Sequence, residues 1–251
     1  MAHCKIVGVE ISLVVALLVV VFAFFSKIGT ATKRMNPPSL PEFFIAEGVQ
    51  YISPAHTSPP FPRDNIPFPP YSAGRMKSYY DWSQRAMVEH YLDACVPIFP
   101  QMSSNDQFEC RFLNVNETSF LITYNDTRPV WMSPCCLFEK PFHPPERRFL
   151  EKINASTLPN LSPVNGKESV WWRVPIEPPT GPFFYAWNLP LRNGTDESQV
   201  YATFDFPGIG SWVTQNFVNV SLDKRPPNET WVLPIEQCGT DAAALPRCPS
   251  F

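Results

Sequence analysis

Proline is the feature of this sequence that most constrains its fold. Thirty of the 251 residues are proline, whereas only 10 are glycine. Proline lacks a backbone donor and breaks helix interiors, so a chain this rich in it is a poor candidate for long helices. Short runs of β-branched and aromatic residues, such as 112–124, 170–176 and 199–206, lie between the prolines. Runs of this kind, separated by turn signals, predict short antiparallel strands.

We therefore expect one mainly β domain over residues 71–251. Further strands are predicted at 71–80, 84–92, 183–191, 213–222 and 230–233, with tight turns at Asn165-Gly166 and Asn193-Gly194. The segment 84–92 could also form a short helix. The best helical candidate in the domain is 144–153.

An apolar segment precedes this domain. Residues 11–25 are apolar except for Ser12, with Lys5 before them and Lys27, Lys33 and Arg34 after them. Such a segment is either a cleavable signal peptide or a helix that stays in the membrane as a signal anchor. Both interpretations assign residues 1–34 to membrane targeting and predict a protein that is secreted or spans the membrane once.

The next segment, 35–70, is predicted to be a linker. Ten of the residues from 36 to 70 are proline, and the segment ends in Pro-Phe-Pro-Pro. Proline-rich chains are extended and semi-rigid, so this stretch is expected to hold the domain off the membrane if the N-terminal helix is retained. Its apolar residues Phe43, Phe44, Ile45, Tyr51 and Ile52 leave open that part of it lies against the domain.

The domain carries seven Asn-x-Ser/Thr acceptor sequences, more than chance would place there. This excess predicts a glycosylated surface in the secretory pathway. Asn160 is followed closely by Pro163, which weakens that site. The six predicted glycosylation sites are Asn116, Asn125, Asn154, Asn193, Asn219 and Asn228.

The cysteines support the same compartment. One of the seven, Cys4, lies before the apolar segment, and the remaining six are an even number that three disulfides would use: Cys95, Cys110, Cys135, Cys136, Cys238 and Cys248. Six cysteines allow 15 pairings. Adjacent Cys135 and Cys136 face opposite sides of an extended chain. We therefore expect them to bridge two different regions, one of them the Cys238/Cys248 tail.

The order of several short motifs resembles the ependymin-related family. Tyr80-Asp81-Trp82-Ser83-Gln84-Arg85 is similar to an early strand of that family, and Pro134-Cys135-Cys136 to its central cysteine region. Val170-Trp171-Trp172 resembles its tryptophan-containing strand. The segments 217–222 and 232–238 resemble its last strand and its Pro-x-x-x-Cys ending. The adjacent cysteines and the additional Cys248 depart from the family pattern.

The resemblance implies curved antiparallel sheets, of the kind found in bacterial lipoprotein carriers, that form a half-barrel or sandwich around a hydrophobic pocket. The implied partner is a lipid or another hydrophobic small molecule, bound without catalysis. The inner faces of such strands must be large and apolar. The candidate pocket residues are Trp172, Phe184, Trp187 and Phe204, for which an ordinary packed core is the alternative interpretation.

The sequence offers little support for catalysis or for other partners. It has neither His-Glu-x-x-His nor Gly-x-Ser-x-Gly, and no spacing typical of a metal or cofactor site. A net charge of −3 gives no basic footprint for nucleic acid. Two alternatives to the ligand-binding hypothesis stay open: a structural, adhesive or accessory-subunit ectodomain without a small ligand, and a secreted hydrolase. A homodimer and membrane attachment through the N-terminal segment are compatible with each.

Overall fold

The computed structural model describes residues 35–54, 72–99, 101–102, 106–124, 128–138, 142–158, 163–175, 182–189, 199–208 and 211–249. Residues 37–251 form one compact unit, separate from 1–36. The predicted signal peptide or anchor, the whole of 55–70, and the sites Asn125 and Asn193 lie outside the described residues.

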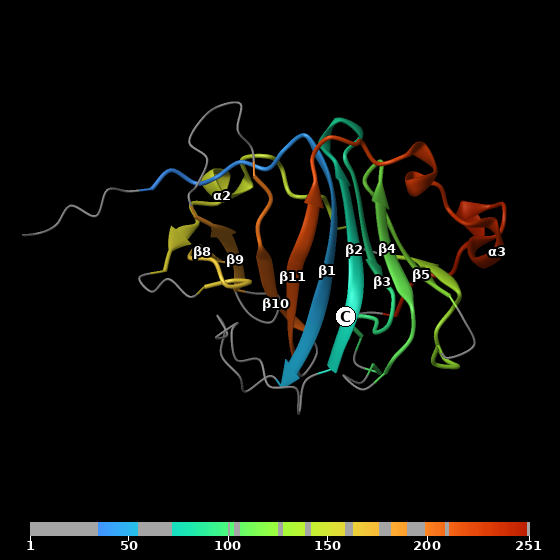
Figure 1. Ribbon diagram of the computed structural model, residues 1–251. Helices are drawn as coiled ribbons and strands as arrows, with labels where there is room; N and C mark the ends of the chain where they lie inside the picture. Colours follow the sequence, from blue (N-terminus) through green and yellow to red (C-terminus); the bar gives the residue numbers. More distant parts are fainter. Residues whose placement is uncertain are drawn as a thin grey trace, which may run out of the picture. The chain divides into compact units, whose positions relative to one another are not determined.

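The described part of this unit is organised around one antiparallel sheet of 11 strands (Figure 1). Its strand order is β6-β5-β4-β3-β2-β1-β11-β10-β9-β8-β7. The strands are β1 (Phe43–Pro54), β2 (Ser72–Asp81), β3 (Ala86–Tyr91), β4 (Cys110–Val115), β5 (Thr118–Thr123), β6 (Cys135–Leu137), β7 (Ser156–Thr157), β8 (Ser169–Val174), β9 (Phe183–Asn188), β10 (Thr203–Gly208) and β11 (Ser211–Ser221). The mainly β, antiparallel prediction is confirmed, but the separate sheets expected from the resemblance are a single sheet.

Strand β1 is the reason for this difference. It pairs with β2 on one side and β11 on the other, so it joins the N-terminal and C-terminal strands into one sheet. The sequence analysis assigned these residues to a linker because prolines surround them. The linker prediction is therefore wrong for 43–54, where Phe44, Ala46 and Ile52 are buried. The described prolines around β1 are Pro37, Pro38 and Pro41 before the strand and Pro54 at its last residue. At these positions the missing backbone N–H donor costs little.

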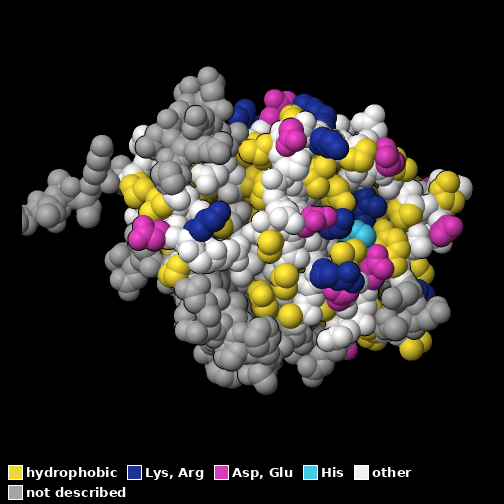
Figure 2. All heavy atoms as spheres, in the orientation of Figure 1, with side chains coloured by type: hydrophobic (Ala, Val, Ile, Leu, Met, Phe, Trp, Pro, Cys, Tyr) yellow, Lys and Arg dark blue, Asp and Glu magenta, His cyan; other side chains and the backbone are white. Residues whose placement is uncertain are grey.

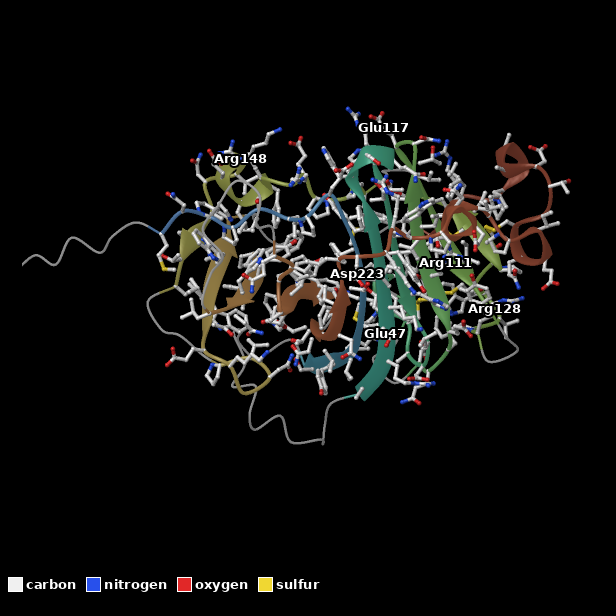
Figure 3. All side chains as sticks on the ribbon, turned by 45° about the horizontal axis from the view of Figure 1, so that its top comes forward. Glu47, Arg111, Glu117, Arg128, Arg148 and Asp223 are labelled. Atoms are coloured by element: carbon white, nitrogen blue, oxygen red, sulfur yellow. A yellow bond between two sulfur atoms is a disulfide. The ribbon has the colours of Figure 1, made fainter. Side chains whose placement is uncertain are left out.

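Most of the other expected strands are present, with two corrections. The hairpin predicted at 112–124 is formed by β4 and β5, and both of its turn residues, Asn116 and Glu117, have positive φ. Glu117 is labelled in Figure 3. The expected strand at 230–233 is instead a 3-10 helix, η3 (Asn228–Trp231), which follows Pro226-Pro227. The expected helix is shorter than predicted, since α2 spans only Phe149–Lys152.

The sheet has two faces with different covering. We call inner the face that bears Phe44, Tyr80, Tyr91, Tyr185 and Trp187, because these residues belong to the largest hydrophobic cluster. The described residues of 94–99, 101–102 and 106–108, together with α2, pack on this face through side chains such as Val96, Phe99, Met102, Phe149 and Leu150.

The opposite, outer face carries two smaller clusters. One includes Val88, Leu113 and Ile122, and residues of the C-terminal segment 225–249 pack against it through Trp231 and Cys238. Arg111 on β4 donates a hydrogen bond to the carbonyl oxygen of Thr230 in this segment (Figure 3). Where the outer face is exposed, basic and acidic side chains lie next to one another (Figure 2).

Three disulfides are formed, by Cys95–Cys110, Cys135–Cys238 and Cys136–Cys248. The prediction that the adjacent cysteines avoid each other and use the tail is confirmed. The expectation that they reach two different regions is wrong, because both bond to the tail. Cys136 belongs to the inner-face cluster and Cys135 to an outer-face cluster, so the tail reaches both sides of β6. The carbonyl of Leu137 accepts a hydrogen bond from the N–H of Cys248.

A glycine at the centre of the sheet allows a β-bulge between Glu47 and Gly48 of β1. A Cβ atom at Gly48 would lie 2.2 Å from the backbone oxygen of Asn216. We expect Gly48→Ala to lower the free energy of unfolding by about 3 kcal/mol, the upper end of overpacking effects, because the obstructing atom is backbone. Urea denaturation would measure this.

Gly74→Ala on the neighbouring strand is the matched control. Its Cβ would approach atoms of the 93–94 loop at 3.2 Å or more, so a smaller loss is expected. Equal losses at the two positions would contradict the role given to the bulge.

Candidate functional site

The structure places three of the four predicted pocket residues on the inner face. Trp172 and Trp187 are buried there, and Phe204 is half-buried against the same cluster. Phe184 is also buried but lies in an outer-face cluster with Trp171 and Ala186. Since successive side chains of a strand alternate between faces, Tyr185 and not Phe184 is the inner residue at this point of β9.

One row of paired residues crosses the inner face over six strands. We call it the transverse row. Each member is the direct partner of the next in the sheet register: Trp172 on β8, Tyr185 on β9, Phe204 on β10, Gln215 on β11, Gln50 on β1 and Gly74 on β2. The row therefore changes from aromatic at β8–β10 to polar at β11 and β1.

The aromatic half of the row is closely stacked. The ring of Phe204 lies parallel to that of Tyr185 at a centroid distance of 4.4 Å and stacks on Phe206 at 4.8 Å. The ring of Tyr201 meets Tyr185 edge-on at 5.0 Å. These side chains form the apolar part of the inner face, where the ring of Phe149 from α2 also meets Tyr185 at 5.0 Å.

The polar half is fully buried and incompletely hydrogen-bonded. Gln50 donates from Nε2 to the carbonyl oxygen of Ala94, and Gln215 donates from Nε2 to the Tyr91 hydroxyl at 2.6 Å. The Oε1 atoms of both glutamines have no partner, and neither does the indole Nε1 of Trp172. Buried polar atoms are paired in most proteins, so the three unpaired atoms make this row a candidate site for a polar group.

A buried carboxyl group, Glu89 on β3, lies on the same face. Its Oε1 accepts a hydrogen bond from the Ser78 hydroxyl at 2.7 Å, while its Oε2 has no partner. Burial raises the pKa of Glu89 to about 8, opposed only by the bond from Ser78. The group is therefore mostly protonated at pH 7.

Four tyrosines share this environment. Burial raises the pKa of Tyr80, Tyr91, Tyr185 and Tyr201, and the charge of Glu89 contributes to the rise for the last three. The Glu89 carboxyl therefore acts electrostatically on Tyr185, which belongs to the aromatic half of the transverse row.

Sequence reasoning missed Gln50, Gln215 and Glu89. A signal existed for Gln50, because it continues the alternation of Phe44 and Ala46 that marks one face of a strand. The interpretation of 35–70 as a linker hid that alternation. For Gln215 and Glu89, the sequence showed polar residues in strands and did not reveal which face they take.

The predicted glycosylation sites within the described residues are all on the surface. The side chains of Asn116, Asn154, Asn219 and Asn228 are exposed. This is the accessibility that an attached glycan requires, and glycosylation itself stays a prediction.

Within the described ranges, no helix is both long and apolar enough to cross a bilayer. Within the same ranges, His, Cys, Asp and Glu side chains form no group of three that could hold a metal ion.

Comparison with known proteins finds distant similarity to solved structures. No family model matches the chain, and no curated protein matches it. Among solved structures, the chain is similar to a putative outer membrane lipoprotein-sorting protein domain from Vibrio parahaemolyticus. The TM-score is 0.33 with 11% identity, over 75% of this chain and 88% of that domain. The resemblance to ependymin-related proteins stays a prediction.

Proposed function

We propose that this domain is a non-catalytic binding module that holds a lipid or another hydrophobic ligand against the inner face of its sheet. The observation that carries the proposal is the transverse row. A solid core without a ligand would leave Gln50, Gln215 and Trp172 each with an unpaired buried polar atom. Each such atom costs about 1–3 kcal/mol, which a bound ligand or water would recover.

The proposed location is extracellular or lumenal. Three disulfides are typical of proteins that mature in an oxidising compartment. The exposure of Asn116, Asn154, Asn219 and Asn228 supports the same location. The proposal is for a secreted protein or the outer part of a single-pass membrane protein.

Mass spectrometry of lipid extracted from the full chain, purified from eukaryotic cells, tests the proposal. We expect a ligand in stoichiometric amount, or uptake of an added neutral lipid that quenches tryptophan fluorescence. A protein that contains no extractable ligand and takes up none would instead favour a structural or adhesive ectodomain.

Two phenylalanines provide a matched pair of variants. Phe204→Ala removes an inner-face ring from the transverse row and is expected to weaken ligand binding by about tenfold or more, because each buried aromatic ring contributes on the order of 1.5–3 kcal/mol. Phe184→Ala removes a ring from the outer face and is expected to leave ligand affinity unchanged. Equal effects of the two variants on affinity would contradict an inner-face site.

A further inference from the structure

The head group of the ligand follows from the same face, on the assumption that the proposed function is correct. We propose that the inner face selects an amphipathic ligand with a neutral, hydroxyl-bearing head group, which Gln50, Gln215 and Glu89 bind by hydrogen bonds. A long-chain alcohol or a monoacylglycerol has this chemistry.

Each glutamine presents an unpaired acceptor. The two residues are direct partners in the pairing of β1 with β11, so their side chains lie next to each other. The Nε2 of Gln50 donates one hydrogen bond to the carbonyl oxygen of Ala94, and the Nε2 of Gln215 donates one to the Tyr91 hydroxyl. Their Oε1 atoms have no partner and are matched by a ligand group that donates hydrogen bonds, while the second N–H of each amide can donate to an acceptor.

Glu89 adds a group that both donates and accepts. When protonated, it can accept from Ser78 at Oε1 and donate from Oε2 to an incoming oxygen. The groups around it are Ser78 on β2, Tyr91 on its own strand and Phe112 on β4. The charge of Glu89 also contributes to the raised pKa of Tyr185 and of Tyr201, so both phenols lie within its electrostatic range. A hydroxyl group, which donates and accepts, complements this set.

Charged head groups are disfavoured on this face. The inner-face residues of the described strands include no Lys, Arg or His, so a carboxylate or phosphate would be buried without a counter-charge. An ammonium group would require Glu89 to lose its proton. The resulting buried ion pair seldom recovers the cost of desolvating both charges.

The tail of the ligand has a defined direction. From the glutamines the transverse row continues without a break to Phe204, Tyr185 and Trp172. An alkyl chain that begins at Gln50 and Gln215 would run over the stacked rings of Phe204 and Tyr185. The polar and apolar halves of the row thus match the two ends of one amphipathic molecule.

Three ligands with one tail and different heads test the inference on the full chain. We would measure the affinities of monolauroylglycerol, laurate and dodecylamine at pH 7 by displacement of a neutral fluorescent dye. Monolauroylglycerol is expected to bind at least about tenfold more tightly than the other two, because sites built around a hydroxyl discriminate against groups that leave their polar atoms unpaired. Gln50→Met and Gln215→Met are expected to abolish this preference, and Gln107→Met, at an exposed position before β4, to retain it.

The outcomes separate the two proposals. Laurate or dodecylamine binding as tightly as monolauroylglycerol would overturn the head-group inference and leave the hydrophobic site intact. A preference that survives in both glutamine variants would also overturn it. Binding of none of the three ligands would overturn both proposals. The ranking in the unmodified protein decides the matter even if a variant does not fold.

Discussion

Replacing Cys136 and Cys248 together by alanine is expected to lower the free energy of unfolding by about 3 kcal/mol. The bond joins residues 112 positions apart, but Cys135–Cys238 already ties the adjacent residue to the tail, so the additional loop contains only 135–136 and 238–248. Closing a loop of roughly a dozen residues removes conformational freedom from the unfolded chain, worth about 3 kcal/mol in the chain-entropy model. Because Cys136 is on β6 at an edge of the sheet, the variant should also release the end of the tail that reaches it. Guanidinium denaturation of the oxidised protein would measure the loss.

The Cys95→Ala, Cys110→Ala double variant provides the comparison. Its loop spans 15 residues, for which the same model gives about 3 kcal/mol. The two loops are of similar length, so the two losses should be similar. A much larger loss in the variant that lacks Cys136 and Cys248 would show that strain or residual structure in the unfolded chain, and not loop length, decides the effect.

Glu89→Gln is expected to stabilise the protein in a way that depends on pH. The unfolded chain ionises this group near pH 4.5, whereas burial keeps it protonated in the folded protein up to about pH 8. Folding therefore binds a proton between these values, and the stability of the unmodified protein falls as pH rises through that window. The variant cannot ionise. At 1.36 kcal/mol for each pKa unit, its advantage should be near zero at pH 4 and about 3 kcal/mol at pH 7.

Urea denaturation at pH 4, 7 and 9 measures this difference. The advantage should stop growing above about pH 8, where the folded protein also ionises. Glu236→Gln, the same change at an exposed position of α3 (Ile235–Cys238), is the matched control and should show no such trend. A constant difference at all three pH values would mean that Glu89 is not kept neutral by burial.

The local pattern of this chain predicted much of its secondary structure. Alternation and turn residues located β4, β5 and β8 to β11, because these signals act over a few residues and do not depend on distant contacts. Asn165-Gly166 adopts the predicted tight turn, with both residues at positive φ. The same local signals gave a wrong prediction at β1, where the flanking prolines indicated a linker despite the alternation. They were also wrong at 230–233, where residues that favour a strand have no partner strand within the described residues.

The candidate site was predicted only in its aromatic half. Trp172, Trp187 and Phe204 were identified because large apolar residues in strands favour burial. Phe184 was assigned to the wrong face, since the alternation within 183–187 gives two sets of side chains and does not say which faces the larger cluster. Gln50 and Gln215 are 165 positions apart in the chain, so no local signal could have paired them.

The sequence by itself determined where most of the short strands lie, the even set of six cysteines and the positions where glycans can attach, because these depend on residue type and spacing. Only the tertiary structure decided that β1 joins both halves into one sheet and that both adjacent cysteines bond to the tail. It also decided that Gln50, Gln215 and Glu89 share a buried face. Each of these depends on strand register, which is set by contacts between segments far apart in the chain.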